Sequence, residues 1–289
     1  MNEKINYFEK LKIPNPDLSV DKYQLQKIYF DNAKADAIFC YKKISKYIKN
    51  EHKILEVGGG IHLLTSYLKS KNFDITSIEP GGFSDYIDRL RNDLINKMNS
   101  TIYTTTLEKY HTNDKFDFIF SMNVLEHTDD IKKHIQSSIK LLRDQNSLLF
   151  IQCPNYNFPF EPHFYKWFIP LFPQFTFKYL RKKSLIKALG KNRYSNILDH
   201  LNFNCTYTNI KKLNLNVKFI NPLADIFERL DNDEIFKKRL FENFIIKFFY
   251  KAINIFRLKN LLIKLFPTFL SPYLIMEIRK SSLNKNNFL

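Results

Sequence analysis

The sequence is poor in cysteine, glycine and tryptophan, and it has no long uninterrupted apolar run. Its 289 residues include three cysteines, six glycines and one tryptophan. Cys40, Cys153 and Cys205 are too few and too widely spaced for a disulfide framework or a paired metal-binding motif, which favours a reducing compartment. No stretch approaches the roughly 18 apolar residues of a spanning helix, and the N-terminus lacks the apolar segment of a secretory signal. We therefore expect a cytoplasmic protein.

The remaining composition is that of a folded, basic protein. Hydrophobic residues make up 44% and charged residues 26%, which excludes collagen-like, coiled-coil and wholly disordered chains. Lys and Arg number 45 against 29 Asp and Glu, a net charge of +16. Residues 181–289 carry 21 basic and 8 acidic residues, and so hold most of the excess. This charge favours an anionic partner, although a mutational bias toward lysine codons also explains part of it.

Short apolar segments alternate with helical patterns through the first half of the chain. This alternation is typical of βαβ units, in which a helix connects two parallel strands, and it therefore predicts a parallel, doubly wound α/β sheet. Right-handed crossovers bring the carboxyl ends of such strands to one edge, where ligands bind. The expected strands cover residues 53–57, 73–79, 101–105, 116–121 and 147–153, and the expected helices cover 61–71, 86–98 and 129–142.

The second half adds two insertions to this sheet. We expect strands six and seven at 217–220 and 273–279, giving a Rossmann-like, mostly parallel seven-stranded sheet. Helical insertions should follow strand five and lie between the last two strands, the latter as one or two long helices within 233–266. The expected divisions are an N-terminal helical segment (1–50), a core (51–154), a substrate lid (155–200) and a C-terminal part with the basic insertion (201–289).

Strand 53–57 runs into an acidic-x-Gly-x-Gly turn formed by Glu56, Gly58 and Gly60, with Gly59 between the glycines. Glycine lets the backbone take positive φ and approach a ligand closely. The third glycine of a dinucleotide fingerprint is replaced by Leu63, and the lysine of a phosphate-binding loop is missing. An acid before the turn suits a positively charged ligand better than a pyrophosphate.

Two further motifs follow at matching positions. Glu79 ends the second strand, about twenty residues after the turn, where a carboxylate can accept both hydroxyls of a ribose. Residues 123–127, Asn-Val-Leu-Glu-His, follow the apolar fourth strand. Taken singly, Glu79 could be a solvated acid at a strand end, and residues 123–127 could cap the next helix. All three motifs in this order and at this spacing are much less likely to occur by chance.

Residues 45–155 resemble the class I S-adenosylmethionine-dependent methyltransferases in these three motifs. The resemblance implies S-adenosylmethionine as cofactor, with its methionine part over the glycine turn, its ribose on the strand-two acid and its adenine near the loop after strand three. Residues 78–83 and 154–164 resemble a bacterial branch that modifies surface glycans or lipid-linked saccharides. The implied cofactor-binding residues are Glu56, Gly58, Gly59, Gly60, Glu79, Pro80, Thr106, Leu107, Asn123 and Val124.

A methyl transfer to oxygen needs a group that removes the acceptor's proton. His163 lies among prolines and aromatics in the expected lid, and His127 follows the strand-four loop directly. We expect His163, or otherwise His127, to be this base; His127 as part of a helix cap is the alternative. Expected acceptor contacts are Tyr156, Glu161 and Tyr165. The scattered histidines and acids show no ligand spacing, so we expect no metal.

These features lead to one expected function and two alternatives. We expect O-methylation of a hydroxyl on a saccharide, glycan or lipid-linked small molecule. A non-catalytic binding or scaffold protein and an RNA methyltransferase are the alternatives. No RNA-binding module is recognisable, so we do not expect a nucleic-acid partner. The basic stretch 241–270 either lies on the inner membrane surface as an amphipathic segment or packs on the sheet.

Overall fold

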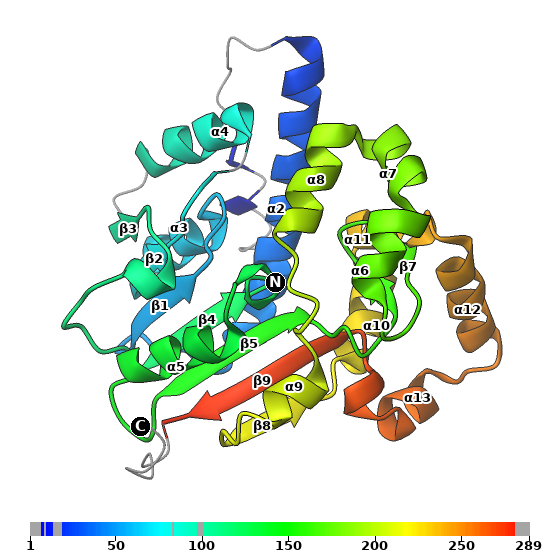
Figure 1. Ribbon diagram of the computed structural model, residues 1–289. Helices are drawn as coiled ribbons and strands as arrows, with labels where there is room; N and C mark the ends of the chain where they lie inside the picture. The colour runs from blue at the N-terminus through cyan, green and yellow to red at the C-terminus, as the bar shows by residue number, and fades with distance from the viewer. Residues whose placement is uncertain (1–6, 9, 14–18, 83, 97–100, 281–289) are drawn as a thin grey trace. The chain divides into compact units, whose positions relative to one another are not determined.

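The computed structural model describes the chain except residues 1–6, 9, 14–18, 83, 97–100 and 281–289 (Figure 1). Three parts of the sequence predictions therefore lie outside the described residues. They are the first part of the expected N-terminal helical segment (1–50), Phe83 of the 78–83 motif and the end of the expected helix 86–98. The chain forms two compact units. Unit 1 contains residues 1–122, 137–149 and 279–289, and unit 2 contains residues 123–136 and 150–278.

Seven strands form the central sheet in the order β3-β2-β1-β4-β5-β9-β8. Strand β1 pairs in parallel with β2 and with β4, β2 pairs in parallel with β3, and β8 and β9 are antiparallel. The expected mostly parallel seven-stranded sheet is thus confirmed. The strands are β1 (Lys53–Val57), β2 (Asp74–Ile78), β3 (Thr101–Tyr103), β4 (Phe118–Met122), β5 (Leu148–Pro154), β8 (Val217–Ile220) and β9 (Tyr273–Arg279).

The first half of the chain has the alternation of strands and helices that its apolar pattern predicts. Strand β1 has four consecutive buried residues and β5 is buried throughout, as in strands that are covered on both faces. The helices are α2 (Val20–Ile44), α3 (Leu63–Ser70), α4 (Asp85–Asn96) and α5 (Ile131–Leu141), with short 3-10 turns η1 (Leu107–Lys109) and η2 (Leu125–His127).

Within unit 2, the segment after β5 begins with a small hairpin that the sequence pattern does not predict. Strands β6 (Phe160–Glu161) and β7 (Lys166–Trp167) pair antiparallel. The expected helical lid therefore starts as a hairpin, and its helices come later. They are α6 (Pro173–Phe175), the π-helical turn η3 (Thr176–Leu180), α7 (Lys182–Leu189) and α8 (Lys191–Asp199), followed by α9 (Tyr207–Lys211).

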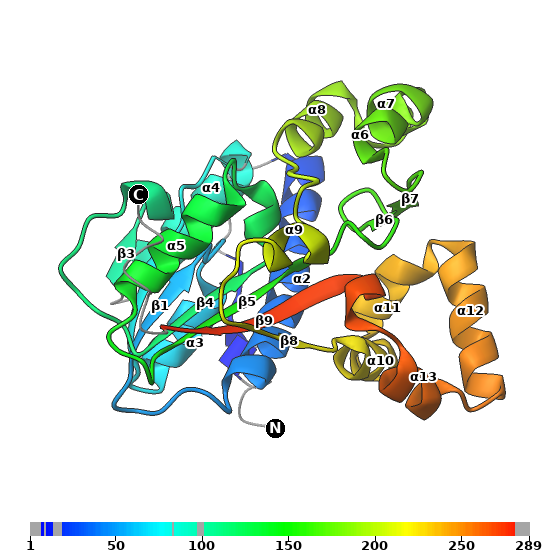
Figure 2. The same cartoon turned by 60° about the horizontal axis from the view of Figure 1, so that its bottom comes forward.

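The insertion between β8 and β9 is a set of short helices (Figure 2). Our expectation of one or two long helices within 233–266 is wrong. The Asn243 side chain caps a new helix by accepting from the amides of Ile245 and Ile246, and Arg257 takes a positive φ of 55°. The helices are α10 (Leu223–Asn232), α11 (Glu234–Phe241), α12 (Phe244–Ile255), α13 (Lys259–Leu265) and the turn η4 (Thr268–Leu270). Among the described residues, no helix is both long enough and apolar enough to cross a membrane.

Candidate functional site

The glycine turn after β1 leaves open space beside its backbone. Gly58 and Gly60 have φ values of 81° and 56°, which favour glycine. A Cβ at Gly59 would stand 2.3 Å from Ser77 Oγ and 2.5 Å from His62 Nδ1, so any side chain there would collide. A Cβ at Gly60 would meet nothing within 4 Å. The turn therefore forms a backbone cradle that a ligand can approach at Gly60.

Glu56 lies buried beside this turn. Its Oε2 accepts hydrogen bonds from the Thr65 hydroxyl and from Ser77 Oγ. Burial raises the pKa of Glu56 to about 7, although these two hydrogen bonds act to lower it. The Glu56 carboxyl therefore titrates near neutral pH, and a cationic ligand nearby would favour its charged form. Thr65 and Ser77 were missed by the sequence analysis, since only the β1–β2 register and the start of α3 bring them to Glu56.

Glu79 joins the glycine turn to the loop after β2. Its Oε2 accepts from the Gly60 amide at 3.0 Å, and its Oε1 accepts from the Gly81 amide at 3.1 Å. Burial raises the pKa of Glu79, while the two amides and Arg91 act to lower it. Each carboxylate oxygen can accept more than one hydrogen bond, so capacity remains for ligand hydroxyls. The structure thus brings Glu79 and Gly60 together, as the motif spacing predicts.

Arg91 is a further residue of this region that the motif analysis missed. Its side chain is buried, and its Nε and Nη1 have no hydrogen-bond partner among the described residues. A Cβ at Gly81 would stand 2.6 Å from Nη1. The guanidinium of Arg91 lies beside the loop after β2, and these two nitrogens could donate hydrogen bonds to a ligand. Its helical position in α4 carries no signal in the sequence.

The other predicted cofactor residues lie in three places. Pro80 is exposed beside Glu79; Thr106 is half-buried, and Leu107 is buried at the start of η1. Asn123 and Val124 belong to unit 2. Asn123 has a φ of 57° and its amide donates to the Gln152 carbonyl, so this residue makes the bend between β4 and η2.

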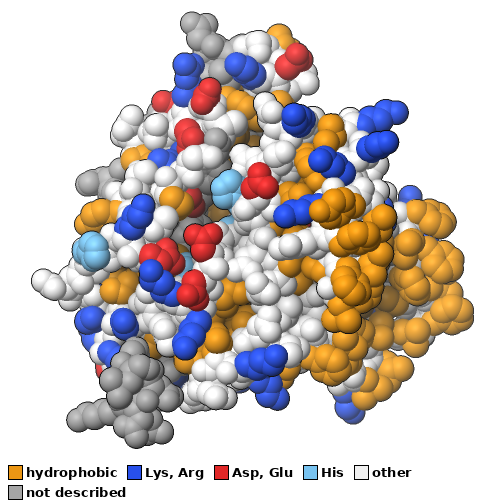
Figure 3. Space-filling view, viewed as in Figure 1, with side chains coloured by type: hydrophobic (Ala, Val, Ile, Leu, Met, Phe, Trp, Pro, Cys, Tyr) orange, Lys and Arg blue, Asp and Glu red, His pale blue; other side chains and the backbone are white. Residues whose placement is uncertain are grey.

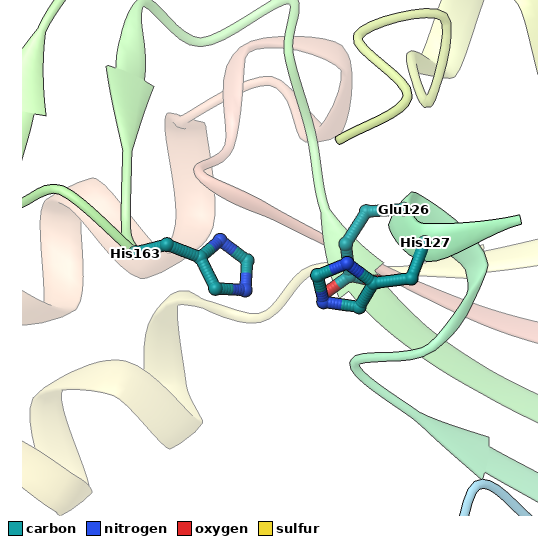
Figure 4. A group of neighbouring side chains, drawn as sticks. All are labelled: Glu126, His127 and His163. Carbon is teal, nitrogen blue, oxygen red and sulfur yellow. The ribbon is translucent and has the colours of Figure 1, made fainter. Parts of the chain in front are cut away.

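Unit 2 gathers a second group of functional side chains, shown in Figure 4. Glu126 and His127 come from η2, while His163 comes from the hairpin connecting β6 and β7. Glu126 is fully buried, and neither of its oxygens accepts a hydrogen bond within the described part of the chain. Burial raises the pKa of Glu126 to about 7, although His163 acts to lower it. The structure adds Glu126 to the predicted pair of histidines.

The side chain of Glu161 holds His163 in one orientation. Its Oε1 lies 2.6 Å from His163 Nδ1 and also accepts from the Tyr156 hydroxyl at 3.3 Å, while its Oε2 accepts from the Phe164 amide at 2.6 Å. Burial acts to lower the pKa of His163, but the Glu161 carboxylate outweighs it and raises the pKa above its ordinary value. With Nδ1 occupied, Nε2 is the ring nitrogen left for a ligand.

His127 faces His163 with ring centroids 4.9 Å apart and planes at 75° (Figure 4). Its Nδ1 lies 3.2 Å from the carbonyl of His200. Desolvation and the neighbouring His163 lower its pKa to about 4, so His127 is neutral at physiological pH although its side chain is 36% exposed.

Glu126, His127 and His163 could also hold a metal ion. One donor atom from each lies within 4.8 Å of the others, and Glu126 Oε1 is 4.0 Å from His127 Nε2. Metal-bound donors stand closer together, at roughly 3.3 Å around a tetrahedral zinc with bonds of about 2.0 Å. The donor atoms of Glu126, His127 and His163 are thus further apart than those around a bound zinc ion. Its donor types nevertheless suit a divalent cation.

Two predicted acceptor contacts, Tyr156 and Tyr165, have hydrogen-bond partners within the protein. The Tyr156 hydroxyl donates to Glu161, and its burial raises its pKa well above the ordinary value. The Tyr165 hydroxyl accepts from Arg239 Nε at 2.5 Å. Tyr156 therefore contacts the same carboxylate that holds His163. Cys153 and Cys205, with sulfurs 3.3 Å apart, are both buried and free, and burial raises the pKa of the Cys153 thiol.

Sequence comparison gives a family and several relatives. A family model described as "Methyltransferase domain" matches residues 31–206. An uncharacterized protein of Mycobacterium tuberculosis is 40% identical over 114 residues, which cover 38% of this chain and 39% of that protein. A ubiquinone biosynthesis O-methyltransferase of Pelagibacter ubique is 28% identical over 195 residues, covering 63% of this chain and 80% of the relative.

Solved structures give weaker likenesses. The protein DesVI of Streptomyces venezuelae has a TM-score of 0.39 and 14% identity, covering 49% of this chain and 60% of its own. An S-adenosylmethionine-dependent methyltransferase from Clostridium acetobutylicum has a TM-score of 0.34 and 15% identity, covering 54% of this chain and 58% of its own.

Proposed function

This chain belongs to the methyltransferase-domain family, and we propose that it transfers the methyl group of S-adenosylmethionine to a hydroxyl of a saccharide, glycan or lipid-linked small molecule. The chain spans 39% of the length of its Mycobacterium tuberculosis relative, so the activity is proposed from its own residues. The observation that carries it is the Glu161–His163 pair, which leaves one imidazole nitrogen free beside His127.

The residues of unit 1 suit the cofactor. The open space at Gly60 accepts the methionine part, and the spare lone pairs of Glu79 accept the ribose hydroxyls. When bound, S-adenosylmethionine supplies an activated methyl group on a positively charged sulfur. Glu56, whose pKa stands near 7, lies next to this turn, and its charged form is favoured by such a cation. The protein's task is then to bind and orient the reactants.

The residues of unit 2 suit proton removal from a hydroxyl. Glu161 fixes the His163 tautomer with the proton on Nδ1, so Nε2 can accept the acceptor's proton. The resulting imidazolium is stabilised by the Glu161 carboxylate and by Glu126. We take oxygen as the acceptor because a hydroxyl must lose its proton when it is methylated. The Pelagibacter ubique relative is likewise named an O-methyltransferase.

The test is transfer of a radiolabelled methyl group from S-adenosylmethionine to lipid-linked saccharides extracted from cell membranes, to free saccharides and to RNA. We expect label in the saccharide fractions. His163→Asn should lower the rate by about 100-fold, in the range that general base catalysis supplies, with unchanged cofactor affinity. His111→Asn is the matched control, since His111 is exposed. Label in RNA would favour the nucleic-acid alternative, and cofactor binding without transfer to any fraction would favour a scaffold.

A further inference from the structure

Two segments of unit 2 expose an unusual number of large apolar side chains. In the first, which covers 169–180, Leu171 is 90% exposed and Tyr179 69%. In the second, which covers 244–270, Phe244 is 77% exposed and Ile255 74%. Helices α12 and α13 have no buried residue at all. Other exposed apolar residues of the two segments are Ile169, Phe172, Phe175, Leu180, Ile245, Phe248, Phe249, Phe256, Leu258, Leu261, Leu265, Phe269 and Leu270.

Positive charge without negative charge lies within the second segment, and at the end of the first segment and just after it. Residues 171–189 contain five basic residues and no acid, and residues 243–272 contain five basic residues and no acid. Most of these cations are exposed, for example Lys178, Lys182, Lys247 and Lys251. Figure 3 shows the apolar side chains gathered on the face that carries α12, with Lys and Arg around them. Apolar residues framed by cations match a surface that is apolar inside and anionic outside.

The arrangement along α12 fits contact with such a surface along the helix side. Phe244 and Phe248 lie four residues apart on one line of the helix, and their rings stack at 6.5 Å. Lys247 and Lys251 form the neighbouring line, from which their long side chains can reach outward to a charged layer. The helix has 12 residues and is therefore about 18 Å long, against about 30 Å for the hydrocarbon core of a bilayer. It can lie on a membrane surface and is too short to cross it.

We propose that unit 2 binds the surface of an anionic phospholipid membrane through the segments 169–180 and 244–270. Helix α12 lies in the interfacial plane, its phenylalanines enter the boundary of the acyl chains, and the flanking lysines contact lipid phosphates. Within unit 2, α12 packs on α11 and α13 packs on α10, and both helices keep exposed apolar side chains. The membrane proposal stands independently of the chemistry proposed for His163.

The test is cosedimentation of the full chain with vesicles of phosphatidylcholine alone and with vesicles that contain 30% phosphatidylglycerol. We expect binding to the anionic vesicles and at least about tenfold weaker binding to the neutral ones. Phe248→Ser with Phe249→Ser should weaken binding to anionic vesicles by at least about tenfold, because both rings are more than half exposed. The ring contacts that the variant loses are the one between these two residues and the one between Phe248 and Phe244. Val20→Ser with Ile28→Ser, at exposed apolar positions of α2, is the matched control and should bind like the wild type.

Charge reversal tests the electrostatic part separately. Lys247→Glu with Lys251→Glu should lower binding to anionic vesicles and leave binding to neutral vesicles unchanged, while Lys132→Glu with Lys133→Glu on α5 should change neither. Failure of the wild type to bind anionic vesicles, or equal binding by the phenylalanine variant, would overturn the proposal. So would a lipid-free dimer that the phenylalanine variant abolishes, because a second copy would then cover the face. Methyl transfer to a soluble acceptor is measured in parallel, so loss of membrane binding and loss of catalysis are distinguished.

Discussion

The Glu161→Gln variant tests the base assignment without knowledge of the acceptor. The substitution keeps the shape of a fully buried side chain and removes its charge. It also replaces one oxygen by an amide that donates hydrogen bonds, so the acceptors for His163 Nδ1, the Tyr156 hydroxyl and the Phe164 amide can no longer all be kept. The pKa of His163 should therefore fall.

The size of the fall follows from the lost interaction. A hydrogen bond to a charged group contributes about 1.5–3 kcal/mol, and one pKa unit corresponds to about 1.4 kcal/mol. The side chain of His163 is 27% exposed, and water screens part of the interaction. The lost interaction should therefore lie at the lower end of this range, and the pKa of His163 should fall.

The assay is a pH titration of the histidine ring signals by NMR, with the His163 signal identified by its loss in His163→Asn. The wild-type pKa of His163 should lie above the ordinary 6.5, and the pKa in the variant should be lower than in the wild type. Glu234→Gln is the control, since Glu234 is 80% exposed on α11. An unchanged or raised pKa of His163 in Glu161→Gln would show that the Glu161 carboxylate does not hold that pKa up.

The same pair contributes to stability with a defined sign. Because Glu161 raises the folded-state pKa of His163, the contribution is fully present below the unfolded pKa of about 6.5 and is lost as pH rises through the folded value. The Glu161→Gln variant should lack this pH-dependent part. Urea unfolding of both proteins at pH 5.5 and 8.5 measures it.

Three further predictions concern the glycine turn, Glu56 and metal ions. Gly60→Ala should weaken binding of S-adenosylhomocysteine by at least about tenfold, because the added methyl group enters the open space of the turn. The control is Gly82→Ala, which also has a positive φ and open space around its Cβ. It should lower the unfolding temperature through left-handed backbone strain and leave ligand binding unchanged. Because the folded-state pKa of Glu56 is raised to about 7, wild-type stability should fall between pH 4.5 and 7, by up to about 3 kcal/mol from this group; Glu56→Gln should remove that fall in urea unfolding, and an equal slope would contradict the burial of the charge. A chelator should leave methyl transfer unchanged if His163 acts as a base, whereas zinc should inhibit by occupying the donors of Glu126, His127 and His163; loss of activity on chelation would instead assign the group to a metal.

Much of the fold could be predicted because local pattern and tertiary structure agree there. The boundaries of β1, β8 and β9 coincide with the apolar segments of the sequence. The sequences of β4 and β5 are almost continuously apolar, and these strands are indeed buried. The insertions could not be predicted as well. The β6–β7 hairpin has only two residues in each strand, too few for any period to show. The helix breaks near Asn243 and Arg257 depend on a side-chain cap and one positive φ inside an otherwise helical pattern.

The candidate site divides in the same way. Glu79 and Gly60 could be related from spacing, because parallel strands end at a common edge, and the Gly60–Glu79 hydrogen bond agrees with that. The proximity of His127 and His163 could not be predicted, since they lie 36 positions apart and the sequence pattern does not show the β6–β7 hairpin that carries His163. Glu126 was overlooked because a carboxyl beside a histidine in a polar loop reads as a solvated cap, whereas the side chain is wholly buried. Tertiary burial, which the sequence does not display, changes its chemistry.

The most direct test of the cofactor account is isothermal titration calorimetry of the purified chain with S-adenosylhomocysteine, in the wild type and in Glu79→Gln, with the exposed Glu51→Gln as control. We expect one binding site in the wild type and in the control. Binding should be about 10- to 100-fold weaker in Glu79→Gln, because hydrogen bonds to a charged group are lost. No binding heat in the wild type, or equal affinity in all three proteins, would contradict it.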